Sequence, residues 1–304
     1  MSDYVFTIIG AAQASEMIAK AADEIAQALI LIGARAGKPD WLAEGLVCDI
    51  PFDDAPPDQA EAAGRAAIRR ALGAAPIDVV AQPVAGRKKA LLVADMEGTV
   101  IANEMLDELA ELRGLRAQIS EITARAMNGE VDFVQALKER VALLKGLPEG
   151  ALADAGKRIR FDPGARALVA TMRAHGAATA LVSGGFHIYA DRVRDEIGFD
   201  IAFANDLDIS GGRLSGTVRE PILAREAKLA TLTQMALHRG LSLQTTIAIG
   251  DGANDLPMIA AAGLGVAYHA KPAVGAQAPH RIDHADLTAL LYAQGYRPNE
   301  ILAG

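Results

Sequence analysis

A short apolar run that stops at an acidic pair constrains this chain more than any other feature of its sequence. Residues 90–94 (Ala-Leu-Leu-Val-Ala) are followed at once by Asp95 and, two positions later, by Glu97. A brief, uninterrupted apolar run is typical of a strand that is buried on both faces of a parallel sheet. Open α/β sheets bind their ligands just beyond the carboxyl ends of such strands. The run therefore predicts a strand that carries two carboxylates to the edge of a ligand crevice.

Composition excludes several classes of protein. The 304 residues suffice for one large or two ordinary domains, and 51% are hydrophobic but only 4% aromatic, which favours a helix-rich α/β protein. A formal net charge of −8 without a long basic block disfavours nucleic-acid binding. Cys48 is the only cysteine, so an internal disulfide is excluded. Without a long apolar segment or a signal-like N-terminus, we expect a cytoplasmic protein that does not enter membranes.

Residues 1–85 predict a small α/β module. The sequence favours strands over 4–9, 42–52 and 77–80, and helices over 14–33 and 57–73. This order resembles an ACT-like regulatory domain, so we expect the module either to bind an effector or to dimerise, and a homodimer is one of these two alternatives. Residues 81–89 (AQPVAGRKK) are predicted to be a linker whose charges are solvated.

Residues 86–304 predict a larger α/β domain with an insertion. From about 103 to 163 the pattern is helical, with turn signals that include Asn128-Gly129, and we expect these helices to cap the crevice. Further strands are predicted over 179–182, 246–249 and 264–268, and they alternate with helices. Such alternation implies right-handed crossovers and a doubly wound, Rossmann-like parallel sheet.

Polar motifs follow three of these strands. They are Asp-Met-Glu-Gly-Thr at 95–99, Ser-Gly-Gly at 183–185 and Gly-Asp-Gly-Ala-Asn-Asp at 250–255. Because adjacent strand ends meet at one edge of the sheet, we expect the three motifs to converge. If the substrate is a phosphate ester, Asp95 and Asp251 offer hard oxygen ligands for Mg2+. Hydroxyls of Ser183 and Thr99, the Gly184 N–H and the ammonium of Lys228 suit phosphoryl oxygens.

These motifs resemble a known family. Four features are similar to the four motifs of the haloacid dehalogenase superfamily. They are D-x-[D/E]-G-T, a hydrophobic residue followed by S-G-G, a separate lysine, and G-D-G-x-N-D. Over roughly residues 88–295, longer segments such as ADMEGTVIANE and GDGANDLPMI resemble the phosphoserine phosphatases within it. The resemblance implies a haloacid dehalogenase-like core with a helical cap, and Mg2+-dependent hydrolysis of O-phosphoserine to serine and phosphate, the last step of serine biosynthesis.

The resemblance also implies roles for individual residues. Asp95 would form an aspartyl-phosphate, and Glu97 would protonate the leaving serine oxygen and later activate water. The carboxylates of Asp95 and Asp251 and the backbone carbonyl of Glu97 would hold the metal. Further roles implied are phosphate binding by Thr99, Ser183, Gly184, Gly185 and Lys228, and support of the phosphate and metal side by Asn254 and, indirectly, Asp255.

Three cap residues match those that select the substrate in this family. Glu104 would bind the α-ammonium group of phosphoserine, and Arg140 would bind its α-carboxylate with a two-pronged guanidinium. Phe133 would close over the substrate. As surface charges of helices, Glu104 and Arg140 would have no such role, and Phe133 could equally belong to the core of the cap.

Glu97 departs from the family, in which aspartate is usual at this position. The added methylene shifts the carboxyl group, and a displacement near 1 Å can cost about 10²-fold in rate. Two alternatives stand beside the main interpretation, and Glu97 together with the N-terminal module suggests the second. The chain could hydrolyse another small phosphomonoester, or it could be a slow, degenerate phosphatase that acts as an amino-acid sensor.

Overall fold

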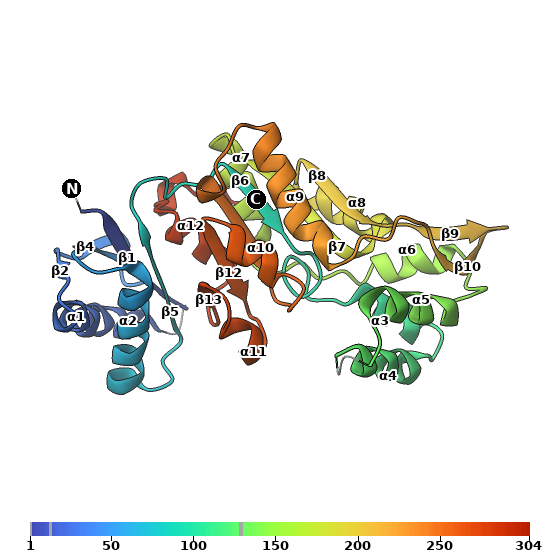
Figure 1. Cartoon of the computed structure of the whole chain (residues 1–304), viewed down its shortest axis with the longest axis horizontal. Coiled ribbons are helices and arrows are strands. Elements are labelled where there is room, and N and C mark those ends of the chain that lie inside the picture. The colour runs from blue at the N-terminus through green and yellow to red at the C-terminus, as the bar shows by residue number, and fades with distance from the viewer. Residues whose placement is uncertain (1, 12–13, 128–129) are drawn as a thin grey trace.

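The computed structural model describes residues 2–11, 14–127 and 130–304, and it shows three parts in a row. The N-terminal module lies at one end, a central sheet with helices follows, and a helical cap lies at the other end (Figure 1). The predicted turn at Asn128-Gly129 lies outside the described residues. Among the described residues, no helix is both long and apolar enough to cross a membrane.

The N-terminal module is an antiparallel sheet with two helices on one face. Its elements are β1 (Tyr4–Gly10), α1 (Ser15–Leu31), β2 (Arg35–Ala36), β3 (Asp40–Ala43), β4 (Val47–Asp53), α2 (Pro57–Leu72) and β5 (Ile77–Pro83). The strand order is β2-β4-β1-β5, and β3 pairs with β4. Alternate residues of β1 point to opposite faces: Phe6 and Ile8 pack under the helices, whereas Ile9 joins the core cluster of the central domain. The second face of this sheet therefore packs against the rest of the protein.

The single strand predicted over 42–52 is confirmed only in part, because β4 covers its second half while its first residues belong to a separate strand. The structure has two antiparallel strands there, β3 and β4, and Gly45 between them has φ of 68°. That left-handed conformation is accessible to glycine at little cost, so the chain reverses at this point.

The central domain contains a six-stranded parallel sheet, which confirms the predicted fold class. Its strands are β6 (Leu91–Ala94), β7 (Ala178–Phe186), β8 (Ile201–Asn205), β11 (Thr246–Gly250), β12 (Leu264–Tyr268) and β13 (His280–Ile282). Their order is β13-β12-β11-β6-β7-β8, so successive strands are added on one side of β6 up to β8 and on its other side from β11 onward. In open α/β sheets, ligands bind at this switch point.

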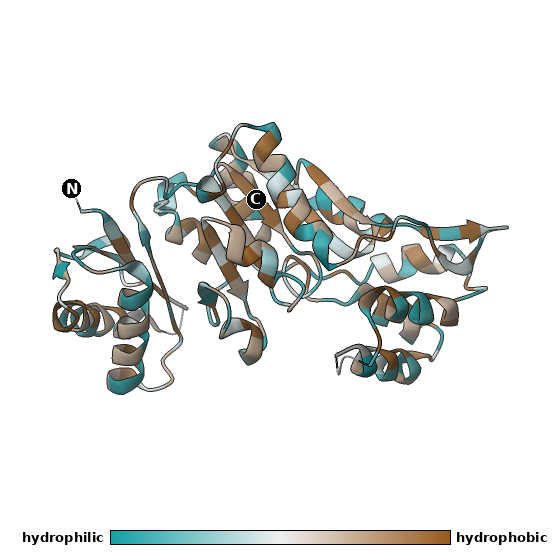
Figure 2. Ribbon diagram, in the orientation of Figure 1, coloured by the Kyte–Doolittle hydropathy of each residue, from teal (hydrophilic) through white to brown (hydrophobic). Residues whose placement is uncertain are grey.

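Both faces of the central sheet are covered by helices. The helices are α7 (Ala165–Ala174), α8 (His187–Ile197), α9 (Arg225–His238), α10 (Leu256–Ala261), α11 (Pro272–Gly275) and α12 (Ala289–Ala293), with 3-10 turns η2 (Leu243–Thr245) and η3 (Pro298–Glu300). Leu91 and Val93 pack with α9 and α10, while Leu92 packs into the cluster on the opposite face. Figure 2 shows the strands mostly in the apolar colour, as burial on both faces requires.

In its described residues, the cap consists of four helices between β6 and α7. They are α3 (Met105–Glu111), α4 (Arg116–Met127), α5 (Phe133–Leu143) and α6 (Gly150–Gly156). A hairpin of β9 (Leu207–Ser210) and β10 (Arg213–Val218) packs against α5 and was not predicted. Gly211 and Gly212 form its turn with φ of 58° and 70°, and this Gly-Gly pair is the sequence signal that could have located it.

The linker charges were expected to be solvated, and this is wrong for Lys89, which is 7% exposed, and for Arg87. Its side chain is only 13% exposed, and its guanidinium donates to both carboxylate oxygens of Asp49, at 2.5 and 2.9 Å. It also donates to Thr7 Oγ1 and, across the domain junction, to the carbonyl of Ala293, each at 2.7 Å. Arg87 is buried because the N-terminal sheet and α12 meet around it, which the local sequence does not encode.

Candidate active site

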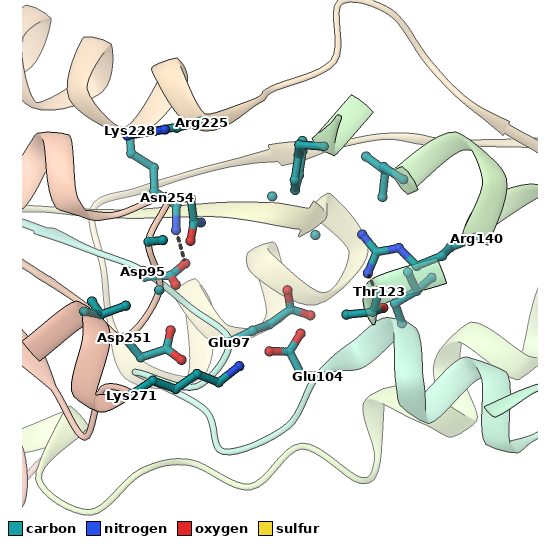
Figure 3. A pocket seen from close by; sticks show the side chains of 18 of the residues that line it. Asp95, Glu97, Glu104, Thr123, Arg140, Arg225, Lys228, Asp251, Asn254 and Lys271 are labelled. Carbon is teal, nitrogen blue, oxygen red and sulfur yellow. Dashed lines mark hydrogen bonds and ion pairs between the residues drawn. The ribbon is translucent and has the colours of Figure 1, made fainter. Parts of the chain in front are cut away.

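A cavity of about 540 Å³ lies where β6 and β11 end, beneath the cap. Asp95 directly follows β6 and Asp251 directly follows β11, so the reversal of strand order brings them together. Figure 3 shows core and cap side chains converging on this space. The predicted site residues that line it are Asp95, Glu97, Glu104, Phe133, Arg140, Gly184, Gly185, Lys228, Asp251 and Asn254.

The Asp95 carboxylate is held by one of its two oxygens. Oδ1 accepts hydrogen bonds from the Met96 N–H at 2.8 Å and from the Lys228 ammonium at 2.6 Å. Among the described residues, Oδ2 has no hydrogen-bond partner. The carboxylate is therefore oriented through Oδ1, which leaves Oδ2 available to a ligand.

Lys228 lies between two carboxylates. Its ammonium contacts Asp95 at 2.6 Å and Asp255 at 2.5 Å, and only 3% of the residue is exposed. Burial alone would lower its pKa, but the two carboxylates outweigh this effect and raise it, so the side chain stays charged. The second oxygen of Asp255 accepts the Gly252 N–H at 3.0 Å. Gly250 leaves room for this arrangement, since a Cβ there would lie 2.3 Å from Asp255.

The carboxylates of Asp95, Asp251 and Asp255 fit a divalent cation. One oxygen of each lies within 4.8 Å of the others. Burial raises the pKa of Asp95 and of Asp251, and the negative charge of Asp255 raises both further. Gly98, with φ of 73°, allows this approach because a Cβ would lie 2.7 Å from Asp251 Oδ2. Crowded hard oxygen donors of this kind are stabilised by a divalent metal ion.

Glu97 reaches past Asp95 toward the cap. Its Oε1 accepts the backbone N–H of Met105, the first residue of α3, at 2.8 Å. Its other oxygen lies against Gly185, where a Cβ would be 2.9 Å away. Burial raises the pKa of Glu97, while the bond from Met105 opposes the shift. The structure thus places a carboxyl of raised pKa between Asp95 and the cap.

The cap side of the cavity contributes a carboxyl group, a guanidinium group and an aromatic ring, from Glu104, Arg140 and Phe133. Glu104 projects into the cavity, where burial, followed by the charges of Glu97 and Asp251, raises its pKa to about 8 (Figure 3). Arg140 lies across the cavity and has no carboxylate within ion-pair distance among the described residues. The Phe133 ring rests on Gly184, since a Cβ there would lie 2.9 Å from its tip.

Three predicted residues lie outside the wall of this cavity. Asp255 is behind Lys228 and fully buried. Ser183 lines a small neighbouring hollow with Gly184 and Asn254, and its Oγ accepts the Gly185 N–H at 2.8 Å. Thr99 is buried, and its hydroxyl has no partner among the described residues.

Sequence reasoning did not identify several polar side chains in the cavity wall. They are Thr123 from α4, Arg225 from the first turn of α9, and Lys271 from the loop after β12. Arg225 precedes Lys228 by three positions and therefore shares its helix face, a spacing that could have indicated it. Nothing in the sequence around Thr123 separates it from other helical threonines.

Comparisons with known proteins agree with this geometry. A family model for haloacid dehalogenase-like hydrolases matches residues 92–260. A protein of Streptococcus thermophilus named phosphoserine phosphatase is 48% identical over 199 residues, which are 66% of this chain and 93% of that protein.

Two crystal structures resemble nearly the whole chain. A HAD family hydrolase from Salmonella enterica serovar Typhi has a TM-score of 0.82 at 28% identity, covering 96% of this chain and 98% of that one. A probable phosphoserine phosphatase from Vibrio cholerae, in unliganded form, has a TM-score of 0.76 at 29% identity, covering 98% and 88%. By sequence match, fold and arrangement of the strand-end carboxylates, the chain belongs to the haloacid dehalogenase-like hydrolases.

Proposed function

We propose that this protein is a Mg2+-dependent phosphoserine phosphatase. One observation carries the proposal: Asp95, paired with Lys228, faces the same cavity as Glu104 and Arg140. The first pair suits the phosphate of O-phosphoserine, and the second suits its ammonium and carboxylate groups. The relatives named as phosphoserine phosphatases support the same substrate.

The reaction proceeds in two displacements at phosphorus. Asp95 Oδ2 attacks the phosphorus atom, the bond to the seryl oxygen breaks, and that oxygen takes a proton from the Glu97 carboxyl as serine leaves. Glu97, now a carboxylate, then removes a proton from water, whose oxygen attacks the phosphorus. The bond to Asp95 breaks, phosphate leaves, and both side chains return to their first state.

The phosphate is bound by charge and by close backbone approach. Lys228 presents a buried ammonium and shares a small hollow with Ser183, Gly184 and Asn254, and Gly185 lines the main cavity. Thr99 is fully buried, and its backbone N–H donates to the carbonyl of Met96 in the segment after β6.

Asp95, Asp251 and the Glu97 backbone carbonyl would hold the Mg2+, with Asp255 acting indirectly through Lys228 and the Gly252 N–H. The ion supplies positive charge that offsets the negative charge of the phosphate. Oxygen-only donors favour Mg2+ over softer metals.

Phosphate release from O-phosphoserine, with Mg2+ present, tests the proposal. Wild type should release phosphate, and Asp95→Asn should reduce the rate at least about 10³-fold, because the amide is a poor nucleophile. Equal release by both proteins would contradict an aspartyl-phosphate. If the rate on another small phosphomonoester exceeds the rate on O-phosphoserine, the result would instead support the alternative in which that compound is the substrate.

The sensor alternative is favoured by one observation, the bond from Met105 that engages the Glu97 carboxylate. If this bond holds Glu97 away from the leaving oxygen, the protein binds O-phosphoserine but turns it over slowly. Glu97→Asp distinguishes the two functions, since restoring the usual aspartate would then raise the rate. An unchanged or lower rate would exclude the sensor.

We further propose a cytoplasmic location and a homodimer formed through the N-terminal module. We place the boundary between the two domains at residues 85 and 86, in the segment that joins β5 to β6.

A further inference from the structure

The Arg140 guanidinium is oriented by two neighbours, although no carboxylate pairs with it among the described residues. Its Nε donates to the carbonyl of Ala136, one turn earlier in α5, at 3.2 Å. Its Nη1 donates to the hydroxyl oxygen of Thr123, on the adjacent helix α4, at 3.4 Å. An arginine has five N–H donors, so three make no hydrogen bond to a described residue: one on Nη1 and both on Nη2.

The Thr123 hydroxyl is itself fixed. Its proton is donated to the carbonyl of Ile119, four residues earlier in α4, at 3.0 Å. Back-bonding of this kind to the i−4 carbonyl is common for helical threonine, and it sets the side-chain rotamer. Because the proton is committed to Ile119, the oxygen can only accept from Arg140. Toward Arg140, the Thr123 hydroxyl therefore acts only as a hydrogen-bond acceptor, and it fixes the direction of one edge of the guanidinium.

Both residues line the cavity. Figure 3 shows the Arg140 guanidinium next to Thr123, with the Glu104 carboxylate facing the same open space. A flexible arginine loses conformational freedom when it binds a ligand, so a side chain oriented beforehand binds more tightly. A two-pronged contact with a carboxylate depends on this orientation more than a single contact does.

We propose that Thr123 is a positioning residue for substrate selection: its hydroxyl orients Arg140 so that the free N–H groups receive the α-carboxylate of the substrate. This role rests on the proposed function, because it requires a substrate that carries such a carboxylate. It predicts a defect in binding that is confined to carboxylate-bearing substrates and leaves the phosphate chemistry intact.

Thr123→Val tests the role, because valine keeps the shape of threonine and removes only the hydroxyl. For O-phosphoserine we expect KM to rise about five- to tenfold, the effect of a modest charge-assisted hydrogen bond, with kcat within twofold of wild type. For O-phosphoethanolamine, which has the phosphate and ammonium groups but no carboxylate, KM should not change. Thr123→Ser should restore the wild-type KM for O-phosphoserine.

Thr233→Val is the matched control. Thr233 is exposed on α9, donates to the i−4 carbonyl of Leu229 at 2.8 Å, and does not line the cavity. An unchanged KM in Thr123→Val, or an equal rise for both substrates, would overturn the role of Thr123.

If wild type releases no phosphate from O-phosphoserine, the proposed function fails, and binding still decides the role of Thr123. Calorimetry of O-phosphoserine with Asp95→Asn, with and without Thr123→Val, supplies that answer. A fivefold or larger rise in Kd supports the role, and an equal Kd or no binding to either protein contradicts it.

Discussion

The Glu97 carboxylate accepts the backbone N–H of Met105 at 2.8 Å, and this bond joins the proposed acid–base group to the first residue of the cap. The N–H groups of the first helical turn have no partner within the helix, so a carboxylate there also stabilises α3. Aspartate, shorter by one methylene, has less reach from position 97. The longer side chain thus links the chemistry of the site to the position of the cap.

Glu97→Gln separates these two roles. The amide oxygen can still accept the Met105 N–H, so the melting temperature should stay at or above that of wild type. The amide cannot transfer a proton, so kcat for O-phosphoserine should fall about 10²- to 10⁴-fold. Calorimetry and a phosphate-release assay measure the two effects. A kcat within threefold of wild type would show that Glu97 does not carry the proton.

Addition of Mg2+ should stabilise the folded protein. Asp95 and Asp251 lie close together with burial-raised pKa values, so a bound cation relieves a cost that the unfolded chain does not carry. At a concentration of 100 times Kd, the gain is about 2.7 kcal/mol. Melting curves with Mg2+ and with a chelator measure it, and activity should disappear with the chelator.

Asp251→Asn provides the comparison for Mg2+ binding. Removing one charge should raise the melting temperature without metal and abolish the increase on adding Mg2+. An increase as large as that of wild type would place the metal elsewhere.

Glu104 should make stability depend on pH. Its pKa rises from the ordinary 4.5 to about 8 in the folded protein, chiefly through burial. Between these values the folded state holds a proton that the unfolded state has released, so stability falls as pH increases from about 4.5 to about 8. Glu104→Gln removes this contribution. The difference between its melting temperature and that of wild type should therefore increase in favour of the variant as the pH rises to about 8.

Melting curves of wild type and Glu104→Gln at pH 5, 7 and 9 measure that difference. Glu121→Gln, on the exposed side of α4, serves as the control for the loss of a surface carboxyl. If the difference between Glu104→Gln and wild type does not change with pH, burial does not raise the pKa of Glu104. The same variant should raise KM for O-phosphoserine, because it loses the partner of the ammonium group.

The central sheet and the strand-end carboxylates were predictable because both follow from local sequence. Leu91 to Ala94 is apolar throughout, as burial on both faces demands, and Asp95 and Asp251 each follow such a run. Parallel topology then brings the two carboxylates together without further information.

Contacts that depend on how separate elements dock were not predictable. Thr123 meets Arg140 only because α4 packs beside α5, and the sequence around either residue resembles an ordinary solvated helix. The linker illustrates the same point, since Arg87 stands among charged and small residues yet lies buried between two domains. Its neighbour Lys88, half exposed and paired with Glu300, fits the expected solvated charge more closely.

Arg87→Ala should therefore destabilise the protein far more than a surface substitution. It leaves Asp49, whose side chain is 7% exposed, without its cation, and it removes the bond to Ala293 that joins the two domains. Loss of one partner of a buried pair costs about 3 to 5 kcal/mol in the free energy of unfolding. Urea denaturation measures this loss.

Arg35→Ala, which removes a 73% exposed arginine from the same sheet, should leave the midpoint nearly unchanged. Arg87→Lys should recover only part of the loss, because an ammonium cannot reach Asp49, Thr7 and Ala293 together. Equal midpoints for the Arg87 and Arg35 variants would mean that the junction contributes no stability.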